Sequence, residues 1–371
     1  MPTSPEATIQ YRPQTAPTPF QNWLDKAAAR LTDWEQWPWK VFYFPLFFTW
    51  AWHCLRARSL WFFSASNPTL TFGGFEGEGK KEMYAQLPPG SFPTTVYVLP
   101  SEDFESAKAK IAAAGLAYPF AVKPDAGMKG LLFRKIENEA QLLDYHSRIP
   151  VEYLVQAWVD LPVELSVFYV RHPTEQRGAI TGMTEKELLH VVGDGQSTLW
   201  ELILENPRAR DYRPEMRQKH EAMLSKILPK GEIFLLAIAA NRNRGARLHN
   251  QKHLIDRELL GFFDHLSHHS GAFFYGRYDI KCTSVEDLKQ GKNYSILEFN
   301  GAGAAPNHIY HCGLTVWAAW AEIRRHWCLL ADISAHNHRH GHRCWPFWEG
   351  LRYLRAARRH FALLKKIDSM I

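Results

Sequence analysis

The sequence lacks the cysteine pairs that mark disulfide-stapled domains and most zinc modules. The five cysteines are scattered, with no CxxC pair: Cys54, Cys282, Cys312, Cys328 and Cys344. An odd, scattered set cannot complete a disulfide framework, so we expect a protein of the reducing cytoplasm. The sequence also lacks an uninterrupted apolar run of the roughly 20 residues that a membrane-spanning helix needs. Its apolar run, 41–55, is shorter and is interrupted by Pro45.

An excess of charge of one sign is absent from most of the chain. The net charge is +6, and residues 322–371 hold ten Lys or Arg against four Asp or Glu, which accounts for the whole excess. Such a basic segment attracts anionic membranes and nucleic acids through the same screened field. We favour an anionic membrane surface as the partner and disfavour nucleic acid.

The N-terminal part is predicted to differ from the rest of the chain. Residues 1–30 are expected to be a disordered leader, because the first 20 are rich in Pro, Thr, Ser and Gln. Residues 31–66 are expected to be an aromatic, apolar helical segment. For the run 41–55 three alternatives stay open: a helix lying in the membrane interface, which its tryptophans suit, a buried packing helix, or a tilted span.

From residue 67 onward, short β-type runs alternate with helical ones, which is typical of α/β proteins. Strands are predicted at 69–72, 94–99, 118–123, 153–159, 165–170, 272–281 and 294–299. Helices are predicted at 80–87, 101–114, 198–204 and 214–227, with Thr198 and Glu201 as a capping box.

The C-terminal segment 317–371 is predicted to be helical and basic. Within 345–371, arginines and apolar residues recur on two separate helical stripes. This amphipathic helix either docks on the protein with a solvated charged face or attaches to a membrane surface. Before it, histidines alternate from His336 to His342. We interpret them as an exposed loop that reinforces the basic tail, in preference to a metal site.

The strongest constellation of chemical groups lies on two predicted strands. Asp279 is followed nineteen positions later by Glu298, and Asn300 shares the face of Glu298 because side chains alternate along a strand. Apolar neighbours predict burial, and buried carboxylates need a partner or a metal. These oxygen donors suit Mg²⁺ held between protein and phosphates. Arg277 shares the face of Asp279 and can neutralise phosphate charge. The alternative is a polar, solvent-facing strand edge.

A second constellation joins a lysine to a glycine-containing loop. Lys123 ends an apolar strand, and Gly127 and Gly130 follow within seven residues. Backbone N–H groups in such a loop can approach phosphates while the lysine supplies positive charge. Alone, the pattern also fits an ordinary exposed strand end. A further motif, 74–80, has P-loop spacing, but Lys81 stands where Ser or Thr would bind magnesium, so we interpret it as a loop facing the site.

In this order, the two constellations resemble the ATP-grasp superfamily over residues 80–308, especially carboxylate–amine ligases such as D-alanine–D-alanine ligase and cyanophycin-synthetase-like proteins. The resemblance implies an α/β ATP-grasp fold, in which two α+β subdomains clasp the nucleotide. It implies ATP and Mg²⁺, with Mn²⁺ as a substitute, a carboxylate substrate and an amine acceptor. The expected reaction forms an amide through an acyl phosphate. A phosphotransferase acting on a hydroxyl, or a non-catalytic nucleotide-binding regulator, is the alternative.

The resemblance also assigns roles to single residues. Phosphate contacts are implied for Lys80, Lys123, Gly127, Lys129 and Gly130, adenine contacts for Gln156, Trp158 and Val159, and a ribose contact for Glu164. Metal ligation is implied for Asp279, Glu298 and Asn300, and catalytic roles for Arg277 and Lys123. The implied domains are a small N-terminal α/β domain at 67–117, a lid subdomain at 118–190, a C-terminal subdomain with the metal site at 191–316, and the helical tail at 317–371. The segment 301–308 departs from the Pro-Gly sequence of the dipeptide ligases.

Overall fold

The computed structural model describes residues 33–128, 130–209, 212–238, 240 and 242–370. The predicted leader and Lys129 lie outside the described residues. The chain divides into two compact units, one ending at Phe48 and the other running from Thr49 to Ile371. The two units are described separately below.

The first unit contains η1 (Trp34–Gln36), α2 (Trp39–Tyr43) and the start of α3 (Phe47–Ala57). Trp34 stacks on Phe42, with ring centroids 4.9 Å apart. The apolar run 41–55 does not form one continuous helix. It is divided between α2 and α3, which are separated at Pro45. In the described part of the chain, no helix is long and apolar enough to cross a bilayer.

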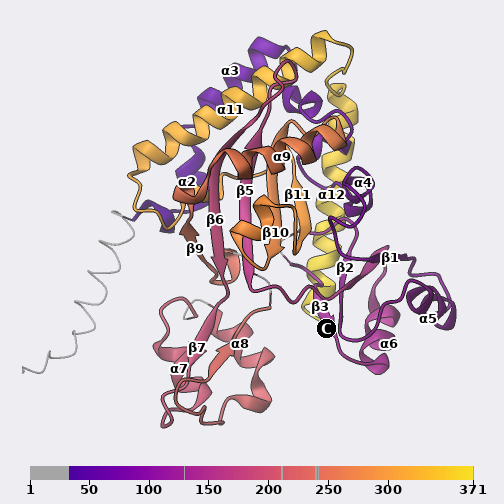
Figure 1. Ribbon diagram of the computed structural model, residues 1–371, viewed down its shortest axis with the longest axis vertical. Helices are drawn as coiled ribbons and strands as arrows, with labels where there is room; N and C mark the ends of the chain where they lie inside the picture. Colours follow the sequence, from indigo (N-terminus) through magenta and orange to yellow (C-terminus); the bar gives the residue numbers. More distant parts are fainter. Residues whose placement is uncertain (1–32, 129, 210–211, 239, 241, 371) are drawn as a thin grey trace, which may run out of the picture. The chain divides into compact units, whose positions relative to one another are not determined.

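The second unit is built on antiparallel sheets with helices packed on them (Figure 1). The four-stranded sheet has the order β1-β4-β2-β3. Its strands are β1 (Thr95–Val98), β2 (Phe120–Pro124), β3 (Arg134–Ile136) and β4 (Tyr153–Ala157), and it packs with α5 (Phe104–Ala113) and α6 (Glu139–Arg148). Because β1 pairs with β4, strand pairing crosses the predicted domain boundary at 117/118.

The five-stranded sheet has the order β11-β10-β5-β6-β9. Its strands are β5 (Val163–Val170), β6 (Ala179–Glu187), β9 (Arg247–Asn250), β10 (Tyr275–Cys282) and β11 (Tyr294–Asn300). One face packs on α4 (Lys80–Tyr84), α9 (Arg257–Ser270) and α10 (Val285–Lys289). Figure 1 shows α9 lying across this face. The mixed α/β architecture confirms the predicted fold class.

Side-chain alternation sets what each face of this sheet carries. On β10, Tyr278 and Ile280 are fully buried in the core with α9, while Arg277 and Asp279 point to the opposite face. That opposite face is covered farther along by α11 (Val316–Arg339) and the short helices η2 (Phe62–Ala65) and η3 (Thr71–Gly74).

A smaller lobe follows β6. It contains the two-stranded sheet of β7 (His190–Val192) and β8 (Ile233–Leu235), with α7 (Leu199–Glu205), α8 (Arg213–Lys219) and η5 (Glu221–Met223). The predicted capping box of Thr198 and Glu201 is confirmed, with both reciprocal bonds present. The helix predicted at 214–227 ends at Lys219. The remaining short helices are η6 (Arg242–Arg244), η7 (Lys252–Leu254) and η8 (Asn307–Ile309).

The C-terminal helix α12 (Phe347–Asp368) is docked on the protein. Its apolar stripe is buried: Leu354 enters the core beneath α11, and Phe361 and Leu364 enter the core of the four-stranded sheet. The arginines of its other stripe are exposed. The sequence left open whether this helix docks on the protein or attaches to a membrane. Its apolar stripe packs inside the protein.

Two local predictions are wrong. Residues 69–72 form no strand, because the side chain of Asn67 binds backbone groups of Gly73 and Tyr275 and turns the chain into η3. This also removes the strand that a P-loop at 74–80 would require. The histidines predicted to lie in an exposed loop begin inside a helix: His336 and His338 belong to α11, and His336 stacks on His340 one turn later, with ring centroids 4.0 Å apart. His338, His340 and His342 are exposed, as predicted.

Candidate functional site

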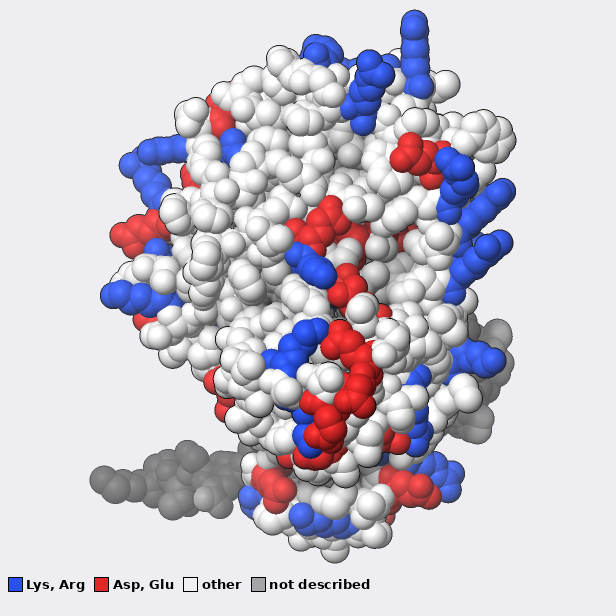
Figure 2. Space-filling model, turned by 90° about the vertical axis from the view of Figure 1, so that its right-hand side faces the viewer, with Lys and Arg blue, Asp and Glu red and all other residues white. Residues whose placement is uncertain are grey.

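A pocket opens between the edges of the two larger sheets. Figure 2 shows acidic and basic side chains side by side in the middle of one face of the molecule. The predicted site residues that line the pocket are Lys80, Lys123, Gly127, Gly130, Gln156, Trp158, Val159, Glu164, Asp279 and Glu298. Segments far apart in the sequence thus meet at one cavity.

The floor of the pocket is an acidic face made by β10 and β11. Asp279 lies directly opposite Glu298 in the antiparallel register, and Arg277 lies opposite Asn300. Directly opposed carboxylates repel each other, so the pair needs compensating cations. Each acid has its own lysine: Lys186 Nζ lies 3.1 Å from Asp279, and Lys80 Nζ lies 3.2 Å from Glu298.

The cations keep both carboxylates ionised despite burial. Burial favours the protonated form of Asp279, but Arg277 and Lys186 outweigh it and hold the pKa below its usual range. For Glu298, burial again acts upward and Lys80 acts downward, and the net pKa is lowered. Arg277 donates from Nε and Nη2 to Asp279, at 3.3 and 3.2 Å, and the Asn300 amide is 3.4 Å from the same carboxylate. Arg277 and Asn300 therefore both contact Asp279, and neither of them lines the pocket.

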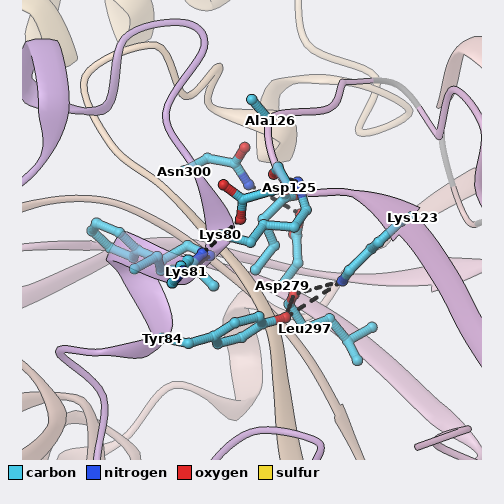
Figure 3. Close-up of polar contacts among 12 residues, drawn as sticks. Lys80, Lys81, Tyr84, Lys123, Asp125, Ala126, Asp279, Leu297 and Asn300 are labelled. Atoms are coloured by element: carbon cyan, nitrogen blue, oxygen red, sulfur yellow. Dashed lines mark hydrogen bonds and ion pairs between the residues drawn. The ribbon is translucent and has the colours of Figure 1, made fainter. Parts of the chain in front are cut away.

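Lys123 lines the pocket, and the carboxylates of Glu298 and Asp125 compensate its charge only in part. Its Nζ is 3.4 Å from the Tyr84 hydroxyl and 3.5 Å from the Leu297 carbonyl, as the dashed lines in Figure 3 show. Burial, followed by repulsion from Lys80, lowers the pKa of Lys123 to about 7. A lysine whose charge is this poorly stabilised would gain from an anionic ligand.

The two adjacent lysines at the start of α4 lie in different surroundings. Lys80 is buried and lines the pocket, whereas Lys81 points outward to Glu152, with its Nζ 3.5 Å away. Asp125 fixes this arrangement, because its carboxylate accepts from the Lys81 backbone N–H at 2.8 Å. Gly79 is needed for that approach, since a Cβ there would lie 2.4 Å from the Asp125 carboxylate.

The glycine-containing loop 125–130, which we call the flap, is held by the C-terminal helix. His360 Nε2 lies 2.7 Å from the Ala126 carbonyl at the start of the flap. Just beyond its end, Asp368 accepts from the Leu132 backbone N–H at 3.0 Å and from Arg134 at 2.9 Å. The basic tail predicted from the sequence is thus a support for the flap.

Opposite the flap, the strand β4 and the residues after it form an apolar wall. Gln156 is buried and donates to the Thr95 hydroxyl at 2.7 Å, and both Gln156 and Trp158 line the pocket. Phe133 lies near Trp158, with ring centroids 6.5 Å apart. An apolar wall that includes an aromatic side chain offers a packing surface for a planar ring such as a purine.

Sequence reasoning missed Lys186, which is 7% exposed and bridges two predicted site residues. Its Nζ lies 3.1 Å from Glu164 and 3.1 Å from Asp279, and these carboxylates raise its pKa against the effect of burial. Lys281 was also missed; it lines the pocket and donates to the Val159 carbonyl at 3.2 Å. The sequence signal for Lys186 was its spacing of two residues from Thr184, which places both side chains on the same face of β6.

Comparison with known proteins gives structural matches alone. No family model matches the chain, and no curated protein matches it in sequence. Solved structures match with probability 1.00. A bifunctional glutathione synthetase from Pasteurella multocida is 18% identical at a TM-score of 0.35, over 67% of this chain and 36% of its own length. A D-alanine–D-alanine ligase from Bacillus anthracis is 12% identical at 0.40, over 71% and 69%. The VanG D-Ala:D-Ser ligase from Enterococcus faecalis is 14% identical at 0.36, over 66% and 57%.

Proposed function

We propose that the protein is an ATP-dependent ligase that joins a carboxylate to an amine. The observation that carries the proposal is the pairing of Asp279 with Glu298 on the pocket floor, each neutralised by a different lysine. This arrangement would offer two anionic oxygen donors to a cation, and the two lysine ammonium groups would then be free to contact the phosphates of a nucleotide.

The donor set fits Mg²⁺, and Mn²⁺ as its substitute. Asp279, Glu298 and Asn300 would supply oxygens from adjacent strands, and no His or Cys lines the pocket among the described residues. Bound between these residues and the nucleotide, the ion would offset the negative charge of the phosphates.

The chain's own residues then have distinct tasks. Lys80, Lys123 and the flap N–H groups would hold the β- and γ-phosphates, while Trp158 and Val159 would hold the base and Glu164 the ribose. A substrate carboxylate oxygen would attack the γ-phosphorus of ATP. The bond between the γ-phosphorus and the oxygen that bridges it to the β-phosphorus would break, so that ADP leaves and an acyl phosphate forms. Arg277 would stabilise charge on the transferred group, an electrostatic role that dominates phosphoryl transfer.

In the second half of the reaction, an amine nitrogen attacks the carbonyl carbon of the acyl phosphate. Inorganic phosphate leaves, the nitrogen loses a proton, and an amide remains. The loop 301–308 lies beside the acidic face, since Arg277 Nη1 binds the Ala305 carbonyl at 3.2 Å. The substrates would enter on this side.

Hydroxylamine trapping tests the proposal. Purified protein with ATP, Mg²⁺ and a panel of carboxylates should release ADP and form a hydroxamate, with Glu298→Gln as the inactive control. ADP release that yields a stable phosphoester would assign the protein to phosphotransferases. Nucleotide binding with no ADP release from any carboxylate would assign it to regulators.

We further propose that the enzyme acts as a peripheral protein at the cytoplasmic face of a membrane. Support comes from exposed aromatic and apolar side chains, among them Trp52 and Trp348, which are 62% and 69% exposed, and from the outward arginines of α12. Interfacial aromatics and basic residues bind anionic lipid additively, at about 1 kcal/mol for each basic residue.

Co-sedimentation with anionic and neutral liposomes tests this attachment. Because α12 is part of the core, the charge is removed by substitution, with Arg352, Arg355 and Arg359 changed to Gln. Binding of the wild type to anionic liposomes should weaken with salt and with the triple substitution. Equal binding of both proteins, or no binding to anionic liposomes at low salt, would refute the electrostatic attachment.

A further inference from the structure

A second group of ligand atoms lies away from the pocket floor, where η8 meets α11. Within the described residues, the ring nitrogens of His308 and His326 and the carboxylate of Glu322 lie within 4.8 Å of one another. Both Nε2 atoms face one oxygen, Glu322 Oε1, at 2.9 Å from His308 and 3.1 Å from His326. Glu322 and His326 are one turn apart on the helix, a spacing that places two ligands on one side.

Packing fixes the two imidazole rings in this orientation. His308 lies against β6 at Gly182, where a Cβ would be 2.1 Å from the ring, so only glycine admits it. His326 is 1% exposed and meets Phe168 edge to face, with centroids 4.4 Å apart. Neither ring can turn away without repacking the sheet face, so the nitrogens are preorganised.

The group already attracts a cation. Arg325 Nη2 lies 2.5 Å from Glu322 Oε1 and 3.5 Å from His326 Nε2. Three nitrogen atoms thus converge on one carboxylate oxygen, which has only two lone pairs to offer as a hydrogen-bond acceptor. Arg325 is 47% exposed and is the one member that can swing into solvent.

The distances also suit metal coordination. Tetrahedral bonds of about 2.1 Å place neighbouring ligand atoms about 3.4 Å apart. The two measured nitrogen-to-oxygen separations are a few tenths of an ångström shorter, so small outward movements would accommodate an ion. Two imidazoles and a carboxylate are a donor set that selects a borderline transition ion over Mg²⁺.

We propose that His308, Glu322 and His326 bind a divalent transition-metal ion of the zinc class. Arg325 holds the same place when the ion is absent and moves outward when it binds. The ion would fasten the segment 301–308, which follows the acidic strand β11, to α11. The site is distinct from the proposed Mg²⁺ site in both ligands and ion preference.

Titration of the full-length protein with Zn²⁺, and with Co²⁺ as a spectroscopic probe, tests the proposal in excess Mg²⁺. The wild type should bind one equivalent, and Co²⁺ should give visible absorption bands of a low-coordinate site. Glu322→Gln, and separately His308→Asn, should weaken binding about 100-fold or more. Arg325→Met removes the competing cation while retaining every ligand, so its affinity should rise about tenfold.

Two controls keep the outcome decisive. A variant with His338 and His342 changed to Gln should bind like the wild type, because the exposed histidine tract is not the proposed site. Circular dichroism checks that each variant is folded. If Glu322→Gln or His308→Asn does not fold, the metal affinity of Arg325→Met still tests the proposal. The proposal is overturned if neither the wild type nor Arg325→Met binds one equivalent of either ion, or if affinity follows the histidine tract. These readouts need no nucleotide, so they do not depend on the proposed ligase activity.

Discussion

Lys186 provides the sharpest test of how the pocket is held together before any ligand binds. Its ammonium group is nearly excluded from water and lies 3.1 Å from both Asp279 and Glu164. The substitution Lys186→Met keeps the unbranched, apolar part of the side chain and removes the charged group at its end. Asp279 then keeps Arg277 at 3.2 Å, whereas Glu164 loses the lysine that neutralises it. Removing one member of a buried ion pair costs roughly 3–5 kcal/mol. Since Glu164 borders the pocket and can regain water, we expect about 3 kcal/mol.

The assay is urea unfolding at pH 7 without nucleotide or metal. Lys281→Met is the matched control: this lysine lines the same pocket but donates to a backbone carbonyl, so its loss should cost only about 1 kcal/mol. Adding Glu164→Gln to Lys186→Met removes the stranded carboxylate and should recover about 1 kcal/mol or more. The reasoning is refuted if Lys186→Met costs no more than the control, or if the two substitutions at 186 and 164 are additive.

Three further predictions concern the rest of the site. The pKa of Lys123 is lowered from 10.5 to about 7 in the folded protein. Between these two pH values the unfolded chain binds a proton that the folded chain lacks, so the stability of the ligand-free fold rises with pH. The destabilising effect of Lys123 is therefore complete below pH 7 and lost near pH 10.5. Lys123→Met should therefore stabilise the ligand-free protein by on the order of 3 kcal/mol at pH 6 and hardly at all near pH 10.5, while weakening ATP binding about tenfold; a constant difference across pH would contradict the shift. Asp279→Asn and Glu298→Gln should each abolish Mg²⁺-dependent ADP release in a folded protein, and full activity in either would remove the metal assignment. Asp368→Asn should raise the KM for ATP several-fold by loosening the flap, measured against the surface-pair control Asp144→Asn, which should change nothing.

The sequence predicts the acidic face well because its information is local. Asp279, Glu298 and their partners follow a period of two within short strands, and antiparallel neighbours bring such faces together over a few residues. The order of the motifs then indicated one nucleotide site. Lys80 could not be separated from Lys81 by spacing, because the choice is made by Asp125, which is distant in sequence and binds the backbone of α4.

Lys186 escaped prediction for a related reason. Its strand contains Gly182 and ends in Thr-Glu-Lys-Glu, a composition that disfavours a strand by propensity. Gly182 is present because the ring of His308 lies against it, a contact between segments more than a hundred residues apart. Tertiary packing therefore decides the conformation of β6, and only the paired sheet reveals that Lys186 faces Asp279.

Under the proposed function, the ligand-free arrangement of charges predicts that metal and nucleotide bind together. Three cationic side chains, Lys80, Lys186 and Arg277, now occupy the carboxylates that a divalent ion would use. An ion binding alone would expel these cations into a partly desolvated pocket, where nothing replaces the lost ion pairs. A nucleotide alone would meet ammonium groups already engaged with carboxylates. With both ligands present, Asp279 and Glu298 would hold the ion, and the cations freed from them would contact the phosphates, so every buried charge would stay paired. Each ligand must then raise the affinity of the other by the same factor, because the coupling is reciprocal.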